Sequence, residues 1–303
     1  MNTLYHFSGA GNDFVVIDGR EGDVSAFREV PRIEALCKQY KTDGLMILGP
    51  ALRQAQGPVG ELVEPQGPAV DFTMEFYNPD GSGGMMCGNG GRCIVAFADY
   101  LGIRPTVVRQ AQGPGSEQVP ELVEGPAEYL FMAPDGLHTG EILERPGGST
   151  GSPTDRWIVR IKMIDVQGIT PMLGGYFLNT GTRHFVKFVD DVEQVDVDAE
   201  GKALRWNEAF APIGTNVNFV HVAEDGLHVR TFEKGVEGET LACGTGLTAS
   251  ALVAHHAGVP TATPGAYRLR ARQDWLSVNF TPGADEKFTD VYLTGPARLV
   301  EIH

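Results

Sequence analysis

The sequence predicts a strand-rich α/β (α+β) chain of two pseudo-symmetric halves, with one long helix at the centre of each half. Short runs rich in β-branched and aromatic residues alternate with helical patterns along the chain. A cysteine followed by Gly-x-Gly and an apolar helical run occurs twice, at Cys87 and Cys243. Each cysteine lies 11 residues after a phenylalanine that ends a predicted strand, Phe76 or Phe232. The halves therefore read as two copies of one unit.

The first half is predicted to start with a strand and to contain two helices. PRIEALCKQY (31–40) has proline at a starting position and apolar residues at helical spacing. GRCIVAFADYLG (91–102) is apolar and ends in glycine, as many helices do. The strands predicted in this half are FVVID (14–18), LMIL (45–48) and DFTMEF (71–76).

The second half repeats this order. GLTASALVAHHAG (246–258) is its predicted central helix and also ends in glycine. NVNFVHV near its start is similar to GNDFVVID in the first half. The strands predicted in this half are 158–164, 184–189, 216–222, 227–232 and 290–295.

Two copies of one short sequence interrupt this pattern. Residues 53–64 and 109–124 both begin RQAQGP and end in ELVE. Glycine, proline and glutamine dominate both copies, without helical or strand periodicity. We predict inserted surface loops at 53–68 and 109–126, because added loop length costs little free energy. A proline-rich segment that docks a partner is the alternative.

Bulk composition narrows the function and the location. The 303 residues are enough for two domains. The net charge of −15 argues against a nucleic-acid or anionic-membrane partner, because phosphate binding needs clustered Lys and Arg. No run of 18 apolar residues predicts a membrane span, and the N-terminus has no secretory pattern. Four cysteines without such a signal indicate free thiols in a reducing compartment, the cytoplasm.

The repeated cysteines suggest a chemistry. A helix N-terminus favours the thiolate of a cysteine and offers backbone N–H groups that bind a carboxylate. If the two halves face each other, Cys87 and Cys243 lie on opposite sides of the carbon attached to that carboxylate. One thiolate can then remove a proton from this carbon while one thiol delivers a proton to the other face. The pattern predicts a two-base racemase or epimerase.

The cysteines also allow interpretations other than a two-base mechanism. Cys37 and Cys93 fit packing roles, since Cys93 lies about 240° round its helix from Cys87. No metal is expected, because no Cys-x-x-Cys or paired-histidine spacing occurs. A Cys–His nucleophile with His184 and a disulfide redox pair remain alternatives.

Four longer motifs now mark a family. GAGNDFVVID (9–18), NPDGSGGMMCGNGGRC (78–93), GTNVNFV (214–220) and FEKGVEGETLACGTG (232–246) closely resemble diaminopimelate epimerase. The resemblance runs through both halves and misses mainly the two RQAQGP insertions. It implies a cofactor-independent enzyme that interconverts LL- and meso-2,6-diaminoheptanedioate, on the route to lysine and peptidoglycan. It also implies that Cys87 and Cys243 are the acid/base pair.

The resemblance implies a fold and a domain division as well. Each domain would be a barrel-like mixed sheet around its central helix, and the C-terminal strand would return to the first domain. The N-terminal domain would span 1–160 plus 292–303, and the C-terminal domain would span 161–291. A small-molecule amino-acid substrate is expected, without nucleic acid, membrane or metal partners. A homodimer is retained as an open prediction.

Substrate-binding roles follow from the resemblance at matching positions. The backbone of Gly88, Asn89, Gly244 and Thr245 would hold the reacting carboxylate. His184 is a further candidate site residue. The residues expected to hold the distal amino-acid end of the substrate are Asn12, Asn78, Asn216, Glu233 and Lys234.

Two departures concern the distal end. Lys234 stands where the family usually has arginine, and lysine cannot copy a bidentate carboxylate contact. Thr182 and Arg183 replace the family's usual Asn-Pro before His184, and Arg183 could supply the guanidinium charge that is missing at Lys234. Two alternatives to the epimerase stay open: a related racemase of the proline or hydroxyproline type, and a non-catalytic relative that binds an amino acid.

Overall fold

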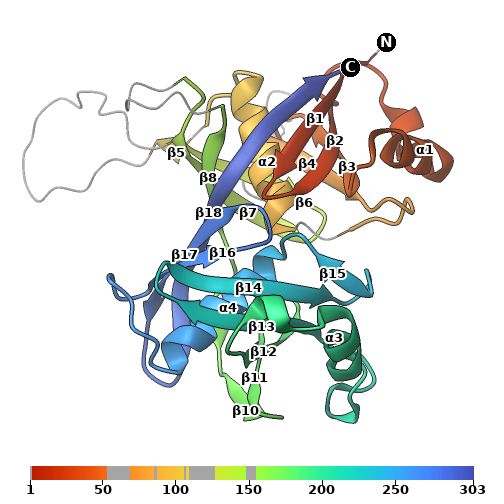
Figure 1. The fold of residues 1–303 in the computed structure, drawn as a ribbon. Coiled ribbons are helices and arrows are strands. Elements are labelled where there is room, and N and C mark those ends of the chain that lie inside the picture. Colours follow the sequence, from red (N-terminus) through yellow and green to blue (C-terminus); the bar gives the residue numbers. More distant parts are fainter. Residues whose placement is uncertain (1, 53–68, 85–86, 106, 109–126, 148–154) are drawn as a thin grey trace, which may run out of the picture.

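The structure is a computed structural model that describes residues 2–52, 69–84, 87–105, 107–108, 127–147 and 155–303. Two sheet-and-helix units lie one above the other and share the last strand (Figure 1). The first unit contains β1 (Leu4–Gly9), β2 (Asn12–Asp18), β3 (Gly44–Gly49), β4 (Phe72–Tyr77), β5 (Val107–Val108), β6 (Ala127–Ala133), β7 (Gly136–Glu144) and β8 (Trp157–Lys162). The second unit contains β11 (Gly175–Asn179), β12 (Arg183–Phe188), β13 (Asn216–Ala223), β14 (Gly226–Glu233), β15 (Gly238–Thr240), β16 (Ala266–Arg270), β17 (Trp275–Pro282) and β18 (Lys287–Ile302).

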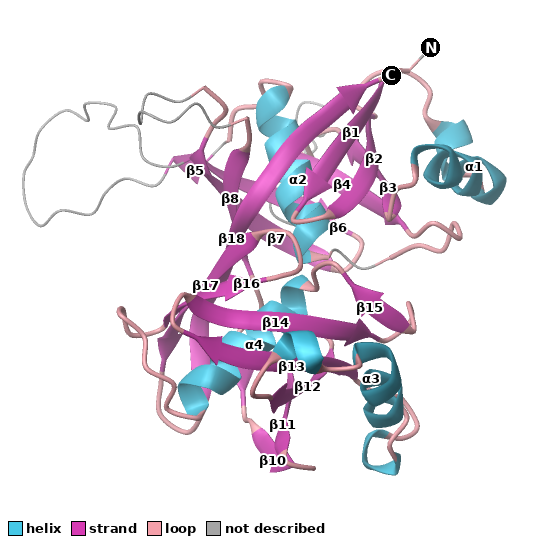
Figure 2. Cartoon of the chain, viewed as in Figure 1, coloured by secondary structure: helices cyan, strands magenta, loops and turns pink. Residues whose placement is uncertain are grey.

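The remaining elements connect or cover these sheets (Figure 2). Short strands β9 (Val166–Gln167) and β10 (Thr170–Met172) lie between the units in sequence. The helices are α1 (Val30–Tyr40), α2 (Gly88–Tyr100), α3 (Val197–Arg205) and α4 (Gly244–His256), with 3₁₀ turns at Ser25–Arg28, Val192–Gln194 and Glu208–Phe210. None of the helices in the described ranges is long and apolar enough to span a lipid bilayer.

Strand pairing repeats from one unit to the other. β1 pairs antiparallel with β2, β2 parallel with β3, β3 antiparallel with β4, and β4 parallel with β6. The same sequence of directions joins β11, β12, β13, β14 and β16. Antiparallel pairs β6–β7–β8 correspond to β16–β17–β18. The prediction of two copies of one unit is therefore confirmed at the level of topology.

Strand β18 joins the two units. Its first part pairs with β17 and β8, and its last residues pair with β1, so that Tyr5 lies opposite Ile302. In Figure 1 it runs as one long arrow from the lower unit into the upper one. The C-terminal strand thus returns to the first sheet, as the family resemblance implies. The predicted division at residues 291 and 292 falls inside this strand, and the domain boundaries stay a prediction.

Each sheet wraps around one central helix. α2 contacts β1, β2, β3, β7, β8 and β18, and α4 contacts strands β11–β14 and β16–β18. Residues 88–98 of α2 are all buried, as are most residues of α4. A helix enclosed by a sheet needs apolar or small residues on every side, which explains the runs CIVAFA and LTASALVA. The barrel-like mixed sheet around a central helix is confirmed.

The outer helices occupy matching places. α1 covers the outer face of β2 and β3 through Ile33, Leu36 and Cys37. α3 covers β13 and β14, and a second outer cluster there contains Val197 and Phe232. Strand β3 lies between α1 and α2, so all six of its residues are buried. This two-sided burial accounts for the unbroken apolar run LMIL.

Most predicted elements are confirmed, with shifted ends. The central helices begin at Gly88 and Gly244 rather than at 91 and 246, because each cysteine acts as N-cap and the glycines form the first turn. The predicted loops 53–68 and 109–126 lie outside the described residues. Their flanks lie together: Leu52 pairs with Val70, and Val108 pairs with Ala127.

Candidate active site

Helices α2 and α4 meet N-terminus to N-terminus. A Cβ built on Gly244 would lie 3.3 Å from the Cα of Gly88, and one built on Gly88 would lie 3.6 Å from the Cα of Gly244. The cysteines that precede these glycines, Cys87 and Cys243, are the N-cap residues of the two helices. The structure therefore brings the two predicted thiols to one place, where a charge on Cys87 acts on Cys243.

Both thiols are withdrawn from water. Cys243 is 7% exposed, and Cys87 is partly buried with its Sγ 3.2 Å from the backbone N of Gly90. Burial raises the pKa of each thiol, and the nearby carboxylate of Glu233 raises both further. Each thiol is therefore protonated at neutral pH, and a proton must leave one of them before it can act as a base.

His184 is connected to Cys243 by hydrogen bonds through Thr245. Its Nε2 lies 2.9 Å from the hydroxyl of Thr245, which in turn lies 3.5 Å from the Sγ of Cys243. Its Nδ1 lies 3.0 Å from the amide nitrogen of Asn218. That amide nitrogen also donates to the carbonyl of Phe185, so it must be the donor, and Nδ1 must be the acceptor.

This hydrogen-bond chain fixes the tautomer of His184. Nε2 carries the hydrogen and donates it to Thr245, whose hydroxyl hydrogen is then available to Cys243. Burial lowers the pKa of His184 to about 3, so the ring is neutral. Neither ring nitrogen is bonded to a cysteine, so the geometry does not form the Cys–His pair that was one alternative. Asn218 was missed, although its position two residues after Asn216 on β13 places both on one face of the strand.

One acidic group, Glu233, lies near both thiols, and a second, Asp43, lies near Glu233. Glu233 ends β14, and burial raises its pKa, with a further rise from Asp43. Asp43 accepts hydrogen bonds from the backbone N of Asp13, at 2.8 Å, and from the side chain of Asn12. Such carboxylates suit an ammonium group of a ligand. Asp43 was also missed, since the only sign in the sequence is an aspartate directly before a buried strand.

Asn89 links the two units across the site. Its amide nitrogen donates to the side-chain oxygen of Asn12 and, at 2.9 Å, to the carbonyl of Ala242. Ala242 directly precedes Cys243. A single side chain on α2 thus contacts both the β1–β2 turn and the segment that carries the second thiol.

The predicted distal residues have internal partners. The Asn216 side chain donates to the carbonyl of Arg183 at 2.9 Å and accepts from the backbone N of Lys234 at 2.8 Å. Asn78 donates to the hydroxyl of Ser82 at 3.0 Å, within the NPDGS turn. Each of these side chains is therefore hydrogen-bonded within the chain and helps to order the segment around it.

Arg183 does not supply the charge proposed for Lys234. Its guanidinium stacks over the ring of Phe177 and donates to the carbonyl of Phe210 at 3.2 Å. Lys234 makes no ion pair with another described residue. The lysine ammonium is therefore the cation in this segment that is available to a ligand.

The other cysteines have packing positions. Cys37 is buried between α1 and the first sheet, and Cys93 is fully buried with its Sγ against Gly9. Within the described ranges, no three His, Cys, Asp or Glu side chains are grouped as metal ligands. Gly88 and Asn89 are the first two residues of α2, and Gly244 and Thr245 are the first two of α4. The backbone N–H groups at these positions lack partners within the helix, as the predicted binding of a carboxylate requires.

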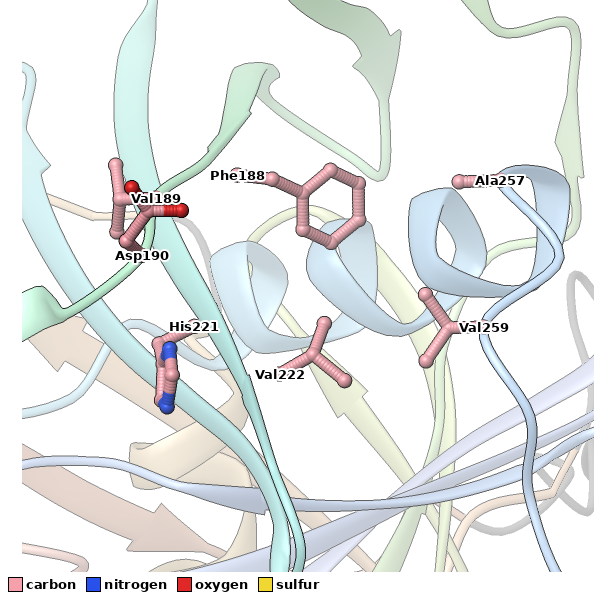
Figure 3. Close-up of a pocket in the computed structure, with 7 residues that line it drawn as sticks. All are labelled: Phe188, Val189, Asp190, His221, Val222, Ala257 and Val259. Atoms are coloured by element: carbon pink, nitrogen blue, oxygen red, sulfur yellow. The ribbon is translucent and has the colours of Figure 1, made fainter.

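A surface hollow of about 450 Å³ lies elsewhere in the second unit (Figure 3). Phe188, Val222 and Val259 line it beside Ala257, the C-cap of α4. A 13-residue helix is about 20 Å long, so this hollow lies about that far from Cys243, at the other end of α4. It contains none of the predicted site residues.

The chain is similar in sequence to proteins of one family. The family model described as diaminopimelate epimerase matches residues 176–300. The protein named diaminopimelate epimerase from Chlorobaculum tepidum is 36% identical over 302 residues, with 97% of each chain covered. The protein of the same name from Aquifex aeolicus is also 36% identical over 302 residues, with 96% of this chain and 93% of the relative covered.

Solved structures are similar in fold at much lower identity. The phenazine biosynthesis protein of the PhzF family from Bacillus anthracis has a TM-score of 0.67 at 11% identity, covering 100% of this chain and 98% of that one. A hydroxyproline epimerase from Agrobacterium vitis has a TM-score of 0.59 at 15% identity, covering 100% and 91%. At such identities these likenesses concern the fold alone.

Proposed function

The chain belongs to the diaminopimelate epimerase family, and we propose that Cys87 and Cys243 are the two acid/base residues with which it interconverts LL- and meso-2,6-diaminoheptanedioate. The observation that supports this pairing best is the contact between the two helix N-termini at Gly88 and Gly244. Each N-terminus combines a thiol with backbone N–H groups, so one α-carboxylate can bind both helices with a thiol on each face of its α-carbon.

Inversion then needs two proton transfers. The thiolate on one face takes the α-proton: the Cα–H bond breaks, an S–H bond forms, and the electron pair passes into the carboxylate. The thiol on the other face gives its proton to the same carbon, so a new Cα–H bond forms with opposite configuration. The N–H groups of both helices stabilise the charge that builds up on the carboxylate. After one turnover the two cysteines have exchanged protonation states.

We propose that the second amino-acid end of the substrate binds the acidic and amide groups around β14. Glu233 accepts from the distal ammonium and Lys234 offers its charge to the distal carboxylate. Asn12, Asn78 and Asn216 shape this end of the site, either by direct contact or by ordering its loops. A proline-type substrate has no second ammonium and would leave Glu233 without a cation to bind, which is why the diamino acid is the better fit.

A turnover assay separates the three functional hypotheses. Conversion of LL-diaminopimelate, without conversion of L-proline or trans-4-hydroxy-L-proline, supports the epimerase. The reverse preference supports the related racemase, and binding by calorimetry without turnover supports the binding protein. Cys87→Ala and Cys243→Ala should each abolish turnover, whereas Cys37→Ala, which changes a buried thiol in α1, should not.

We also propose a cytoplasmic location, which the four free thiols suit. The homodimer stays a prediction, and analytical ultracentrifugation of the purified chain tests it.

A further inference from the structure

Arg92 is a buried charge whose hydrogen bonds go to neutral acceptors, and the carboxylate of Asp274 acts on it only through its charge. It lies in the second turn of α2 and is 0% exposed. Its guanidinium donates to the carbonyl of Gly88 at 3.1 Å, to the side-chain oxygen of Asn89 at 2.9 Å and to the carbonyl of Pro296 at 3.4 Å. Across the described ranges, none of its hydrogen-bond partners is an aspartate or glutamate. Burying a charge with only neutral acceptors costs several kcal/mol.

The place of Arg92 in the helix increases this cost. Arg92 is the fifth residue of α2, and its guanidinium reaches back to the first residue, Gly88. A helix N-terminus is itself the positive end of the helix dipole, which favours anions and disfavours cations. Helix stability therefore gives no reason for arginine here. A negative group close to this end of α2 would give one, and the thiolate of Cys87 and the substrate carboxylate are such groups.

The contacts of Asn89 show what Arg92 can position. Arg92 can only donate, so it fixes the side-chain oxygen of Asn89 toward itself and the amide nitrogen toward the carbonyl of Ala242. That carbonyl belongs to the residue before Cys243. A Cβ built on Gly244 would lie 3.7 Å from the Asn89 oxygen, so this amide is packed directly against the start of α4. The network runs from Arg92 through Asn89 to the second thiol.

We propose that Arg92 is a positioning residue with two roles. It orients Asn89, which holds the segment carrying Cys243 in a fixed position relative to Cys87. It also places a permanent positive charge behind the Cys87 thiolate and the substrate carboxylate. This rests on the proposed two-thiol function. The electrostatic part agrees with the environment of Cys87, where burial raises the pKa of the thiol and the charge of Arg92 acts in the opposite direction.

Two variants separate the charge from the hydrogen bonds. Arg92→Met keeps an unbranched side chain of similar length but removes both. Arg92→Lys keeps the charge but cannot reach three acceptors at once. The control is Arg230→Met, which removes another largely buried arginine with three acceptor groups, Glu239, Val192 and Val195, none of them at the thiols. The readouts are melting temperature, kcat and KM, and the rate at which iodoacetamide alkylates Cys87 as a function of pH.

The expected results differ between the variants. In Arg92→Met, iodoacetamide should alkylate Cys87 at least about threefold more slowly at pH 8, because without the positive charge of Arg92 less of this thiol is present as thiolate. Its kcat should fall by at least about tenfold. Arg92→Lys should recover the alkylation rate but not kcat. Arg230→Met should lower the melting temperature without changing the pH dependence of alkylation.

A double-mutant comparison keeps the proposal testable if Arg92→Met does not fold. If Arg92 acts through Asn89, Arg92→Lys combined with Asn89→Ala should have a kcat within about threefold of Asn89→Ala alone. Multiplicative losses would overturn the positioning role. Two results would overturn the proposal as a whole. The first is an Arg92→Met protein with the alkylation profile and kcat of the wild type. The second is a set of losses that only follow the melting temperature, as in Arg230→Met. Alkylation needs no substrate, so a wild-type chain without turnover would refute the proposed function and leave this test intact.

Discussion

Gly244→Ala tests whether the reaction depends on contact between the two helix N-termini. The added Cβ would lie 2.9 Å from the Cδ2 of Leu293 and 3.3 Å from the Cα of Gly88. Ordinary carbon–carbon contacts are about 3.5–4.0 Å, so the start of α4 must move by roughly 0.5–1 Å. Leu293 is 0% exposed on β18 and has little room to yield. The shift therefore falls largely on the spacing between the two thiols.

The magnitude follows from this geometry. A displacement of 1 Å in a positioned catalytic group can cost about 100-fold in rate, so kcat should fall roughly 10- to 100-fold. Stability should change less: overpacking costs about 1–3 kcal/mol, while alanine in place of glycine in a helix returns up to about 1 kcal/mol. A coupled assay for meso-diaminopimelate formation gives kcat, and thermal unfolding shows that the fold is retained.

Two controls make the Gly244→Ala result specific. Gly83→Ala adds the same methyl group where it would meet no atom of the described residues within 4 Å, and it should leave kcat unchanged. Leu293→Ala combined with Gly244→Ala removes the closest contact and should recover part of the loss. A Gly244→Ala enzyme with wild-type kcat would refute the reasoning that the two N-termini must touch.

The remaining predictions concern pH, the distal site and the insertions. The pKa of His184, about 3 in the folded protein, lies below its unfolded value of about 6.5, so only the unfolded chain binds this proton as pH falls through that interval. Stability is therefore lost as the pH falls. From pH 7 to pH 5, the free energy of unfolding should drop by about 2 kcal/mol more in the wild type than in His184→Gln. Equal drops of the two proteins in chemical denaturation would contradict this prediction. Lys234→Arg should lower KM for LL-diaminopimelate or leave it unchanged, and a strong rise would mean that the distal site is built around lysine. Deletion of 53–66 together with 110–125 should leave melting temperature and activity largely intact, because the chain on either side of each segment is already paired. A large fall in melting temperature or in activity would show that the segments are structural.

The sequence indicated the repeated unit because both signals that define it are local. A strand ending in phenylalanine and a cysteine at a helix start are recognisable within 12 residues, and both recur at Phe232 and Cys243. Enclosed elements were also predictable, since continuous apolar runs such as LMIL stand out. α3 was not predicted, because four of its nine residues are charged and only Val197, Gly201 and Arg205 are buried.

The partners within the site could not be predicted in the same way. The Asn89 amide bonds residues 77 and 153 positions away, and no periodicity relates such distances. The partners of Asp43 and Asn218, which are the backbone of Asp13 and the ring of His184, became visible only in the folded chain. Arg92 lies in a quoted motif, three residues after Asn89 and so on the same helix face, but its lack of a charged hydrogen-bond partner is a property of the folded chain.

The central claim is that two thiols act on opposite faces of one carbon, and solvent exchange tests it most directly. The measurement is deuterium content at the inverted α-carbon of the product and in the remaining substrate, taken early in a reaction in deuterated water. With two bases, the delivered proton comes from a thiol equilibrated with solvent, while the removed proton stays on the other thiol and returns with any reversal. The account predicts deuterium in the product and little in the substrate. Equal early deuterium in both, or protium retained in the product, would mean that a single base acts on both faces.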